Sequence, residues 1–207
     1  MYGSAAPVEI SRQLGVEREI QELERAFAAR EMTPPEFAVR ACALWAELTD
    51  EVVAAAFAGA PWLAGIREVW AEIRERGEHC AVISLSPDFF VRRLLDWGAH
   101  AAHGSRWPEL PTTIPNVRTK YPLSPVDPTG ILTPAAKVKI ARELCAEFGV
   151  PLEDCVAYGD SLSDAELFAA VPVSVAVNAD RHVRDIASYG YTGRDLREAY
   201  GLVSPAR

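Results

Sequence analysis

Two carboxylates four residues apart could hold a metal ion in the second half of the chain. Asp160 and Asp164 closely follow a short apolar run that ends at Tyr158. Their oxygens suit Mg²⁺, which takes one or two protein carboxylates together with phosphate oxygens and water. A turn with a helix capping box, Ser163-x-x-Glu166, explains other polar residues here but gives neither aspartate a role. We therefore predict that Asp160 and Asp164 form a metal site.

A second polar group follows another apolar run and could bind an anion. Here the residues Ser84, Leu85, Ser86 and Pro87 stand in sequence. The hydroxyl of Ser84 and the amides that follow it, beginning with Leu85, could face an anion at the positive end of a helix. The alternative is a capped helix start, with Ser86 as the N-cap before Pro87.

The elements that must position these groups are predicted by the hydrophobic pattern. Apolar residues at helical spacing predict helices over residues 8–14, 20–29, 37–48, 51–58, 62–76, 87–97, 134–148, 164–169 and 181–188. Short apolar runs predict strands, buried on both faces, over residues 80–84, 155–158 and 173–177. Between them, residues 104–130 hold six prolines and predict a long excursion that could include a hairpin.

The order of these elements predicts two units. Residues 1–60 contain only helices, and residues 61–207 alternate strands with helices. Alternation of this kind predicts a parallel, Rossmann-like α/β sheet with right-handed crossovers. Ligands bind such sheets at the carboxyl ends of the strands, where Ser84 and Asp160 are expected to lie.

Composition excludes several classes of protein. The net charge is −8 and no basic cluster is present, which argues against a nucleic-acid partner. The longest apolar stretch, residues 169–177, is too short to cross a membrane, and the first residues lack a secretory pattern. The four cysteines, at positions 42, 80, 145 and 155, have no C-x-x-C spacing, and we expect four small buried thiols in a reducing compartment. We therefore expect a cytoplasmic protein.

Three motifs in order resemble the haloacid dehalogenase superfamily, in its phosphoserine-phosphatase-like branch with a helical cap. The strand ending in Ser84 is similar to the second motif of that family, and Lys137 to the lysine of the third. Gly159, Asp160 and Asp164 are similar to the fourth motif, Gly-Asp-x-x-x-Asp. The resemblance extends over about residues 4–190. It implies an α/β core over residues 61–207 and a small helical cap domain over residues 1–60.

The resemblance also implies a reaction, the Mg²⁺-dependent hydrolysis of a phosphomonoester through an aspartyl-phosphate. It implies that Asp160 binds the metal ion and that Asp164 completes or braces its ligand shell. Ser84, the amide of Leu85 and Lys137 would hold the phosphoryl oxygens. The expected partner is a small phosphorylated metabolite, and homodimer formation is left open.

The cap is expected to choose the substrate. Arg40 lies near the position of an arginine that meets the substrate carboxylate in phosphoserine phosphatases, although the register differs by one residue. Where those enzymes carry a glutamate for the substrate's amino group, this chain has Ala5. The resemblance therefore implies a small phosphomonoester without specifying which one.

The first motif of the family, a strand ending in Asp-x-Asp-Gly-Thr that carries the nucleophile, is absent from these residues. No aspartate precedes Asp50. By the family's topology this strand is central, between those ending at Ser84 and Tyr158. We expect the two strands to close together, or another segment or a neighbouring chain to fill the slot.

Two explanations and one rival remain open. Either the first motif lies upstream of residue 1 and the full protein is an enzyme, or the chain lost it and binds a phosphate ligand or a protein partner without catalysis. In both cases we expect weak Mg²⁺ and phosphate binding by these 207 residues and negligible turnover. The rival is a serine esterase of the GDSL type, with Ser161 as nucleophile and a late histidine such as His182, although the block lies unusually far along the chain.

Overall fold

A computed structural model describes residues 1–111 and 120–203 of the chain. The part of the predicted excursion over residues 112–119 lies outside the described residues. The α-helices are α1 (Ala6–Gln13), α2 (Glu17–Ala28), α3 (Pro34–Leu44), α4 (Asp50–Gly59), α5 (Ile66–Glu75), α6 (Asp88–Val91), α7 (Pro134–Phe148), α8 (Ala165–Ala170), α9 (Arg181–Arg184) and α10 (Leu196–Gly201). Short 3₁₀ helices are η1 (Arg92–Trp97), η2 (Pro128–Gly130), η3 (Leu152–Asp154) and η4 (Leu162–Asp164). The strands are β1 (Ala81–Pro87), β2 (Ala101–Ser105), β3 (Val156–Gly159), β4 (Val173–Val177) and β5 (Tyr189–Tyr191).

Helix α7 shows how local sequence fixes an element of the site. The side chain of Thr133 accepts a hydrogen bond from the amide of Ala136, and Pro134 occupies the first turn, where its missing N–H costs nothing. Gly149 ends the helix in the left-handed conformation, with φ 68°. The predicted bounds of this helix, 134–148, are confirmed.

The strands form two separate sheets, and within each sheet neighbouring strands pair in parallel. One sheet has the order β1-β2 and the other the order β3-β4-β5. Strand β4 is paired on both sides, and Ser174, Val175, Ala176 and Val177 are buried. In the described chain, β1 and β3 each have a strand partner on one side only. The prediction of a parallel α/β architecture is confirmed, and the sheet is divided between β1 and β3.

The strands beside this division are less buried than we predicted. Ala81 of β1 is exposed and the next five residues are only half-buried. Val156 of β3 is 40% exposed, although an apolar strand residue normally packs against a neighbour. The prediction that both strands are buried on both faces is therefore wrong. Nor do the two strands pair with each other, and residues 1–5 form no strand in their place.

Two strands and a helix were not predicted. Strand β2 has the sequence Ala-Ala-His-Gly-Ser, which carries no large apolar side chain, and β5 has only three residues. Helix α10 follows them near the end of the described chain. The predicted helix 87–97 is divided into α6 and η1, and Ser86 belongs to β1 instead of capping a helix.

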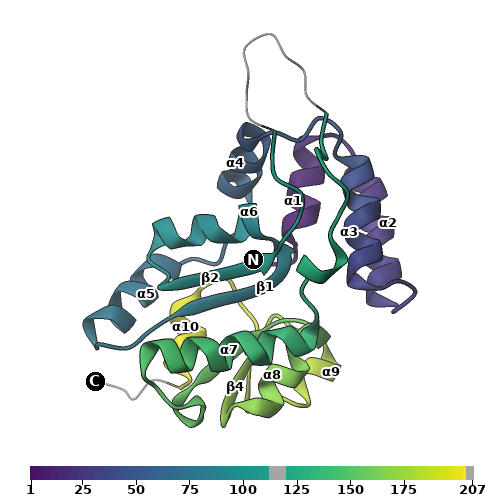
Figure 1. The fold of residues 1–207 in the computed structure, drawn as a ribbon. Helices are drawn as coiled ribbons and strands as arrows, with labels where there is room; N and C mark the ends of the chain where they lie inside the picture. Colours follow the sequence, from purple (N-terminus) through teal and green to yellow (C-terminus); the bar gives the residue numbers. More distant parts are fainter. Residues whose placement is uncertain (112–119, 204–207) are drawn as a thin grey trace.

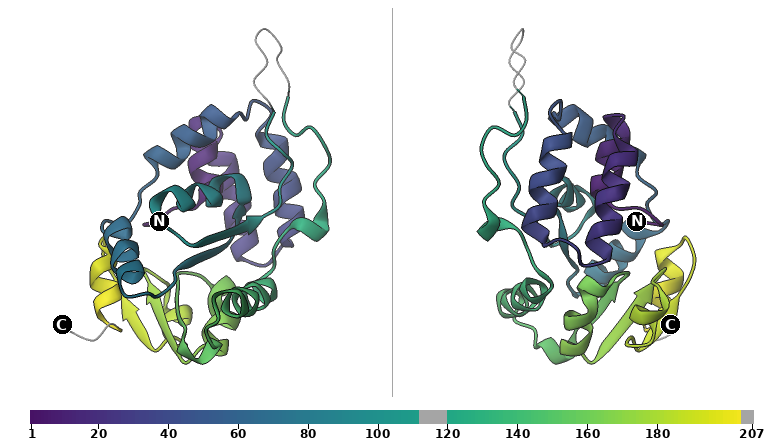
Figure 2. Two further views of the ribbon diagram at one scale, coloured as in Figure 1. Left: turned by 60° about the vertical axis from the view of Figure 1, so that its left-hand side comes forward. Right: turned by 90° about the vertical axis from the view of Figure 1, so that its right-hand side faces the viewer.

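Helices α1 to α4 gather at one end of the molecule, and α7, α8 and α9 lie with β4 at the other (Figure 1). The largest hydrophobic cluster joins α1–α4 to aromatic residues from later in the chain. Trp45, after α3, stacks on Trp107 with ring centroids 5.1 Å apart, and Tyr121 donates its amide to the carbonyl of Ala46. Figure 2 shows the chain on both sides of the undescribed residues, 106–111 and 120–127, running along these helices. The division into units 1–60 and 61–207 stays a prediction.

No helix in the described part of the chain combines the length and the apolar character needed to cross a membrane. The N-terminal end of the chain lies beside β1 and β2 in Figures 1 and 2.

The division of the sheet predicts an uneven pattern of amide hydrogen exchange. In a parallel strand alternate N–H groups face opposite neighbours, so about half of those in β1 and β3 lack a ladder partner. We expect these amides to exchange roughly tenfold or more faster than the amides of β4, which is paired on both sides. Hydrogen–deuterium exchange read by NMR checks this. Uniform slow exchange along β1, β3 and β4 would contradict it.

Candidate active site

The predicted polar groups meet at the carboxyl end of β3. Asp160 is the first residue after β3, and Asp164 ends η4 four residues later. Lys137 stands in the first turn of α7, which packs against η4. The structure therefore brings together three of the predicted residues, from two elements that are distant in sequence.

A buried ion pair joins the two elements. The Nζ atom of Lys137 lies 2.6 Å from Oδ1 of Asp164, and the two side chains are only 6% and 9% exposed. The same ammonium donates a second hydrogen bond, 2.9 Å long, to the hydroxyl of Ser163. Burial of a single charge is very unfavourable, so each member of the pair requires the other.

The second oxygen of Asp164 shapes the loop after β3. Its Oδ2 accepts hydrogen bonds from the backbone amides of Asp160 (3.1 Å) and Ser161 (3.2 Å). The carboxyl group also approaches Gly159 closely, because a Cβ atom at that position would lie 2.5 Å from the carboxyl carbon of Asp164. Only glycine allows this approach. The Gly-Asp-x-x-x-Asp pattern is thus a folding requirement of the loop as well as a source of carboxylates.

Asp160 has the free carboxylate of the site. Among the described residues its carboxylate makes no hydrogen bond to another residue, and Asp160 is exposed at the surface. Loss of hydration among the surrounding protein atoms, and then the negative charge of Asp164, raise the pKa of Asp160; the amino group of Met1 and Lys137 oppose this rise. An exposed carboxylate held near another negative group is well suited to bind a cation.

The donor set fits a magnesium ion in part. Within residues 1–111 and 120–203 no group of three or more His, Cys, Asp or Glu side chains could hold a metal ion. Of the two predicted ligands, Asp164 is already neutralised by Lys137, whereas Asp160 is free. Because Mg²⁺ often binds through one or two carboxylates and substrate oxygens, Asp160 could hold it, with Asp164 bracing the loop.

Ser84 lies in the middle of β1, which packs against α7. The prediction that this strand ends at Ser84 is wrong, because β1 continues to Pro87. Its Oγ accepts a hydrogen bond, 3.2 Å long, from the amide of Ser86. The pairing of β1 with β2 becomes irregular between Ile83 and Pro87, as at a β-bulge. Bulges often re-aim side chains near functional sites, and this one includes Ser84 and Leu85. The phosphate-binding role of these two residues stays a prediction.

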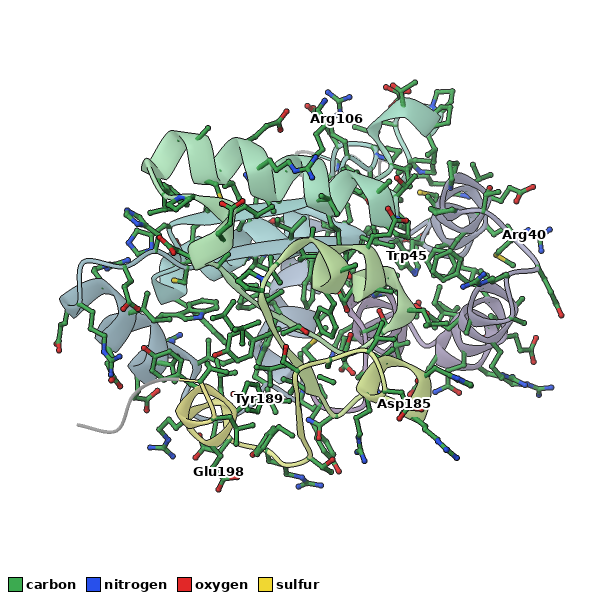
Figure 3. All side chains as sticks on the ribbon, turned by 90° about the horizontal axis from the view of Figure 1, so that it is seen from below. Arg40, Trp45, Arg106, Asp185, Tyr189 and Glu198 are labelled. Atoms are coloured by element: carbon green, nitrogen blue, oxygen red, sulfur yellow. The ribbon has the colours of Figure 1, made fainter. Side chains whose placement is uncertain are left out.

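Arg40 does not join the other predicted residues. It is exposed on α3 and borders a surface groove together with Val126 and Pro128. Figure 3 shows its side chain at the edge of the molecule, pointing outward. The structure thus gives no support to a substrate-binding role for Arg40.

The roles of two serines in the site differ from those that the sequence predicted. Ser163 was predicted to form a capping box with Glu166. Its hydroxyl instead accepts a hydrogen bond from the ammonium group of Lys137. The capping box is formed by Ser161 and Asp164, which are three residues apart. The Ser-x-x-Asp spacing was a visible signal for this pair, whereas the contact of Ser163 with α7 was not visible because it is tertiary.

The esterase interpretation finds no triad in the described residues. The Oγ of Ser161 lies 2.8 Å from the Oγ of Ser163 and 3.4 Å from Oδ2 of Asp164. No hydrogen bond joins Ser161 to His182 or to another histidine in that part of the chain. The hydroxyl therefore lacks the base that a serine nucleophile needs.

The ion pair predicts a large loss of stability when its lysine is removed. We expect Lys137→Met to lower the free energy of unfolding by about 3 to 5 kcal/mol, because Asp164 is left buried without a counter-charge. The matched control is Lys139→Met, two residues along the same helix, where the lysine is 77% exposed and only 3.7 Å from Glu143. Urea unfolding measures both variants. Equal small losses would contradict the assigned role of Lys137.

The raised pKa of Asp160 predicts that stability depends on pH. The folded chain holds the Asp160 proton more tightly than the unfolded chain, so the free energy of unfolding falls as pH rises from about 4 through the raised pKa. Asp160→Asn removes this penalty. We expect the variant to be more stable than the parent at pH 7.5 and nearly equal to it at pH 3.5. Urea unfolding without divalent ions checks this, and the same difference at both pH values would contradict it.

Comparison with known proteins identifies the family of the chain. A sequence profile of haloacid dehalogenase-like hydrolases matches residues 9–169. The phosphoserine phosphatase of Methanocaldococcus jannaschii is 26% identical over 192 residues, which are 92% of this chain and 86% of that protein. A probable phosphatase of Mycobacterium tuberculosis is 46% identical over 52 residues, a quarter of this chain but only 18% of that protein's length.

Solved structures show the same fold. A substrate-bound phosphoserine phosphatase superposes with a TM-score of 0.77 at 23% identity, covering 97% of this chain and 92% of that one. A phospho-aspartyl intermediate analogue of phosphoserine phosphatase superposes with a TM-score of 0.76 at 24% identity, covering 97% of this chain and 92% of that one. Since the profile matches well over half of the sequence and the fold agrees along almost all of it, the chain belongs to the haloacid dehalogenase-like hydrolase family.

Proposed function

We propose that the protein is a Mg²⁺-dependent phosphatase that hydrolyses a small phosphomonoester through an aspartyl-phosphate. The observation that carries this proposal is the free carboxylate of Asp160, held beside the buried Lys137–Asp164 pair at the carboxyl end of β3. A cation site next to a fixed ammonium group can hold a phosphate dianion between two positive charges. The family membership supports the same chemistry.

Each residue of the site has a role in this proposal. Asp160 would hold the magnesium ion, and Asp164 would fix both the loop and the ammonium group of Lys137. When bound, Mg²⁺ offsets negative charge on a phosphoryl group. Lys137 would stabilise the charge on phosphoryl oxygens, and Ser84 with the amide of Leu85 would bind the remaining oxygens.

The nucleophile of this proposal is a carboxylate on a strand placed between β1 and β3. Support comes from the division of the sheet, from the exposed apolar Val156 beside it and from the absence of any aspartate before Asp50. The amino group of Met1 also interacts electrostatically with Asp160. A strand that precedes residue 1 would therefore have its carboxyl end beside the proposed metal-binding carboxylate.

The substrate is proposed only as a class. The named relatives include a phosphoserine phosphatase and a phosphoglycolate phosphatase of Saccharolobus solfataricus, the latter 42% identical over 69 residues, which are 31% of this chain and 30% of that protein. Both names describe small phosphorylated acids. A cytoplasmic location and a homodimer remain predictions, and a phosphate-binding protein without catalysis is the alternative function.

The decisive experiment adds the proposed strand. We expect residues 1–207 alone to hydrolyse p-nitrophenyl phosphate negligibly. A version that carries an apolar strand ending in Asp-x-Asp-Gly-Thr ahead of residue 1 should hydrolyse this substrate at least about a hundredfold faster. Two-step covalent catalysis needs the carboxylate of the first added aspartate as its nucleophile. The gain should disappear with EDTA, with Asp160→Asn, and when the first added aspartate is replaced by asparagine.

Two outcomes would contradict the proposal, the first its nucleophile and the second its catalytic activity. Robust turnover by residues 1–207 alone would place the nucleophile elsewhere. A folded, extended version that binds phosphate but never turns over would favour the non-catalytic alternative. Circular dichroism and thermal unfolding of the extended version show whether it is folded.

A further inference from the structure

Two thiols lie in contact at the end of α7 that is remote from the site. All four cysteines of the chain are free. Cys42 and Cys145 are buried, but Cys80 and Cys155 are partly exposed, so the prediction that all four are buried is wrong for the latter two. The Sγ atoms of Cys145 and Cys155 are 3.4 Å apart, in contact but not bonded.

The other two cysteines have different surroundings. The thiol of Cys42 lies 3.5 Å from the hydroxyl of Tyr121, and that of Cys80 lies 3.5 Å from Nδ1 of His100. Among the cysteines, all of which lie in the described residues, 145 and 155 are thus the pair that the fold brings together.

The two thiols and the Lys137–Asp164 ion pair both join α7 to the β3 segment, at opposite ends. Lys137 is in the first turn of α7 and Cys145 is in its last turn. Asp164 follows the carboxyl end of β3, whereas Cys155 directly precedes its first residue. Helix α7 therefore contacts the two ends of the β3 segment in different ways: by an ion pair at the site, and by two thiols about two helical turns away.

We propose that Cys145 and Cys155 form a reversible disulfide when the protein meets a low-molecular-weight disulfide such as oxidised glutathione. One cysteine thiolate attacks a sulfur of the glutathione disulfide, which forms a mixed disulfide and releases one glutathione thiolate. The second cysteine thiolate then attacks the protein sulfur of that mixed disulfide and releases the other. Both protons pass to the two glutathione thiolates, so two protein thiols are oxidised and one glutathione disulfide is reduced.

The environment of the pair sets the conditions of this reaction. Burial, and then the hydrogen bond and charge of Cys145, raise the pKa of Cys155 to about 12. The reduced, protonated pair is therefore the resting form near neutral pH, and exchange accelerates as pH rises. Partial exposure of Cys155 gives the oxidant access to one sulfur.

The disulfide should stabilise the fold without occupying the site. It closes a loop of ten residues and so restricts the unfolded chain. For a protein of this size we expect the melting temperature to rise by about 5 to 10 °C on oxidation. Phosphate and Mg²⁺ binding should not change, because the bond forms at the opposite end of α7 from Lys137.

The test uses residues 1–207 in glutathione redox buffers at pH 8, quenched with N-ethylmaleimide under denaturing conditions. The expected product carries two maleimide groups instead of four, has no bound glutathione, and yields a peptide that links residues 145 and 155. Cys42→Ser/Cys80→Ser should keep this product. Cys145→Ser and Cys155→Ser should each lose it, together with the rise in melting temperature.

Several results would overturn the proposal. The parent protein could keep four alkylatable thiols across the whole range of buffers, or it could bridge a different pair or form only disulfides between chains. Mass spectrometry of the parent protein distinguishes these results even if a serine variant fails to fold. A bridge that leaves the melting temperature unchanged would contradict the stabilising role.

Discussion

The buried ion pair between Lys137 and Asp164 is the constraint on which the rest of the site depends. Two charges removed from water are tolerated only when they meet each other and when other groups satisfy their remaining hydrogen bonds. Here Ser163 takes a second bond from the ammonium group, and two backbone amides bond to the free carboxylate oxygen. The pair therefore fixes the position of α7 against the loop after β3.

This arrangement separates the tasks of the two carboxylates. Asp164 points inward and is used by the fold, whereas Asp160 is held on the surface with its carboxylate free. The glycine before Asp160 allows the close approach that makes this possible. The raised pKa of Asp160 indicates that its negative charge lowers the stability of the folded chain, which is the cost of keeping a charged carboxylate free at the site. The free carboxylate is the feature most consistent with metal-assisted chemistry.

The divided sheet is the second constraint. Backbone groups at a sheet edge that are buried without a partner cost about 1–3 kcal/mol each, so an edge beside the core must be paired or hydrated. The partial exposure of β1 and of Val156 shows that these edges are open to solvent. In contrast, β4 is enclosed by neighbours on both sides and is buried. Within each of the two sheets the strands pair in parallel.

Elements whose ends or apolar runs are marked in the local sequence were predicted correctly. Helix α7 was predicted to the residue because Thr133, Pro134 and Gly149 mark its ends, and β4 was predicted because its apolar run is continuous. Strand β2 was missed because its pairing with β1 is tertiary and its small residues carry no hydrophobic pattern. The role of Arg40 stays a prediction, because its place in the cap was inferred from a register that differs by one residue, and one residue turns a side chain by about 100° around a helix.

Within the site, composition and spacing identified Asp160 and Asp164 but not their different environments. That difference arises from Lys137, which is 27 residues away in sequence and meets Asp164 only in the folded chain. The role of Ser163 depends on the same contact. Ser84 and Leu85 were chosen because the predicted strand ended at Ser84. Strand β1 instead continues to Pro87, and the irregular pairing around these residues could not be deduced from the sequence.

The central claim is that Asp160 and Lys137 together form a site for a metal-bound phosphate. Isothermal titration calorimetry of inorganic phosphate into residues 1–207, with and without Mg²⁺, tests it most directly. The account predicts that Mg²⁺ strengthens phosphate binding about tenfold or more, that Asp160→Asn abolishes this gain and that Lys139→Met leaves it intact. Phosphate affinity that is the same with and without Mg²⁺, or a gain that survives Asp160→Asn, would contradict it.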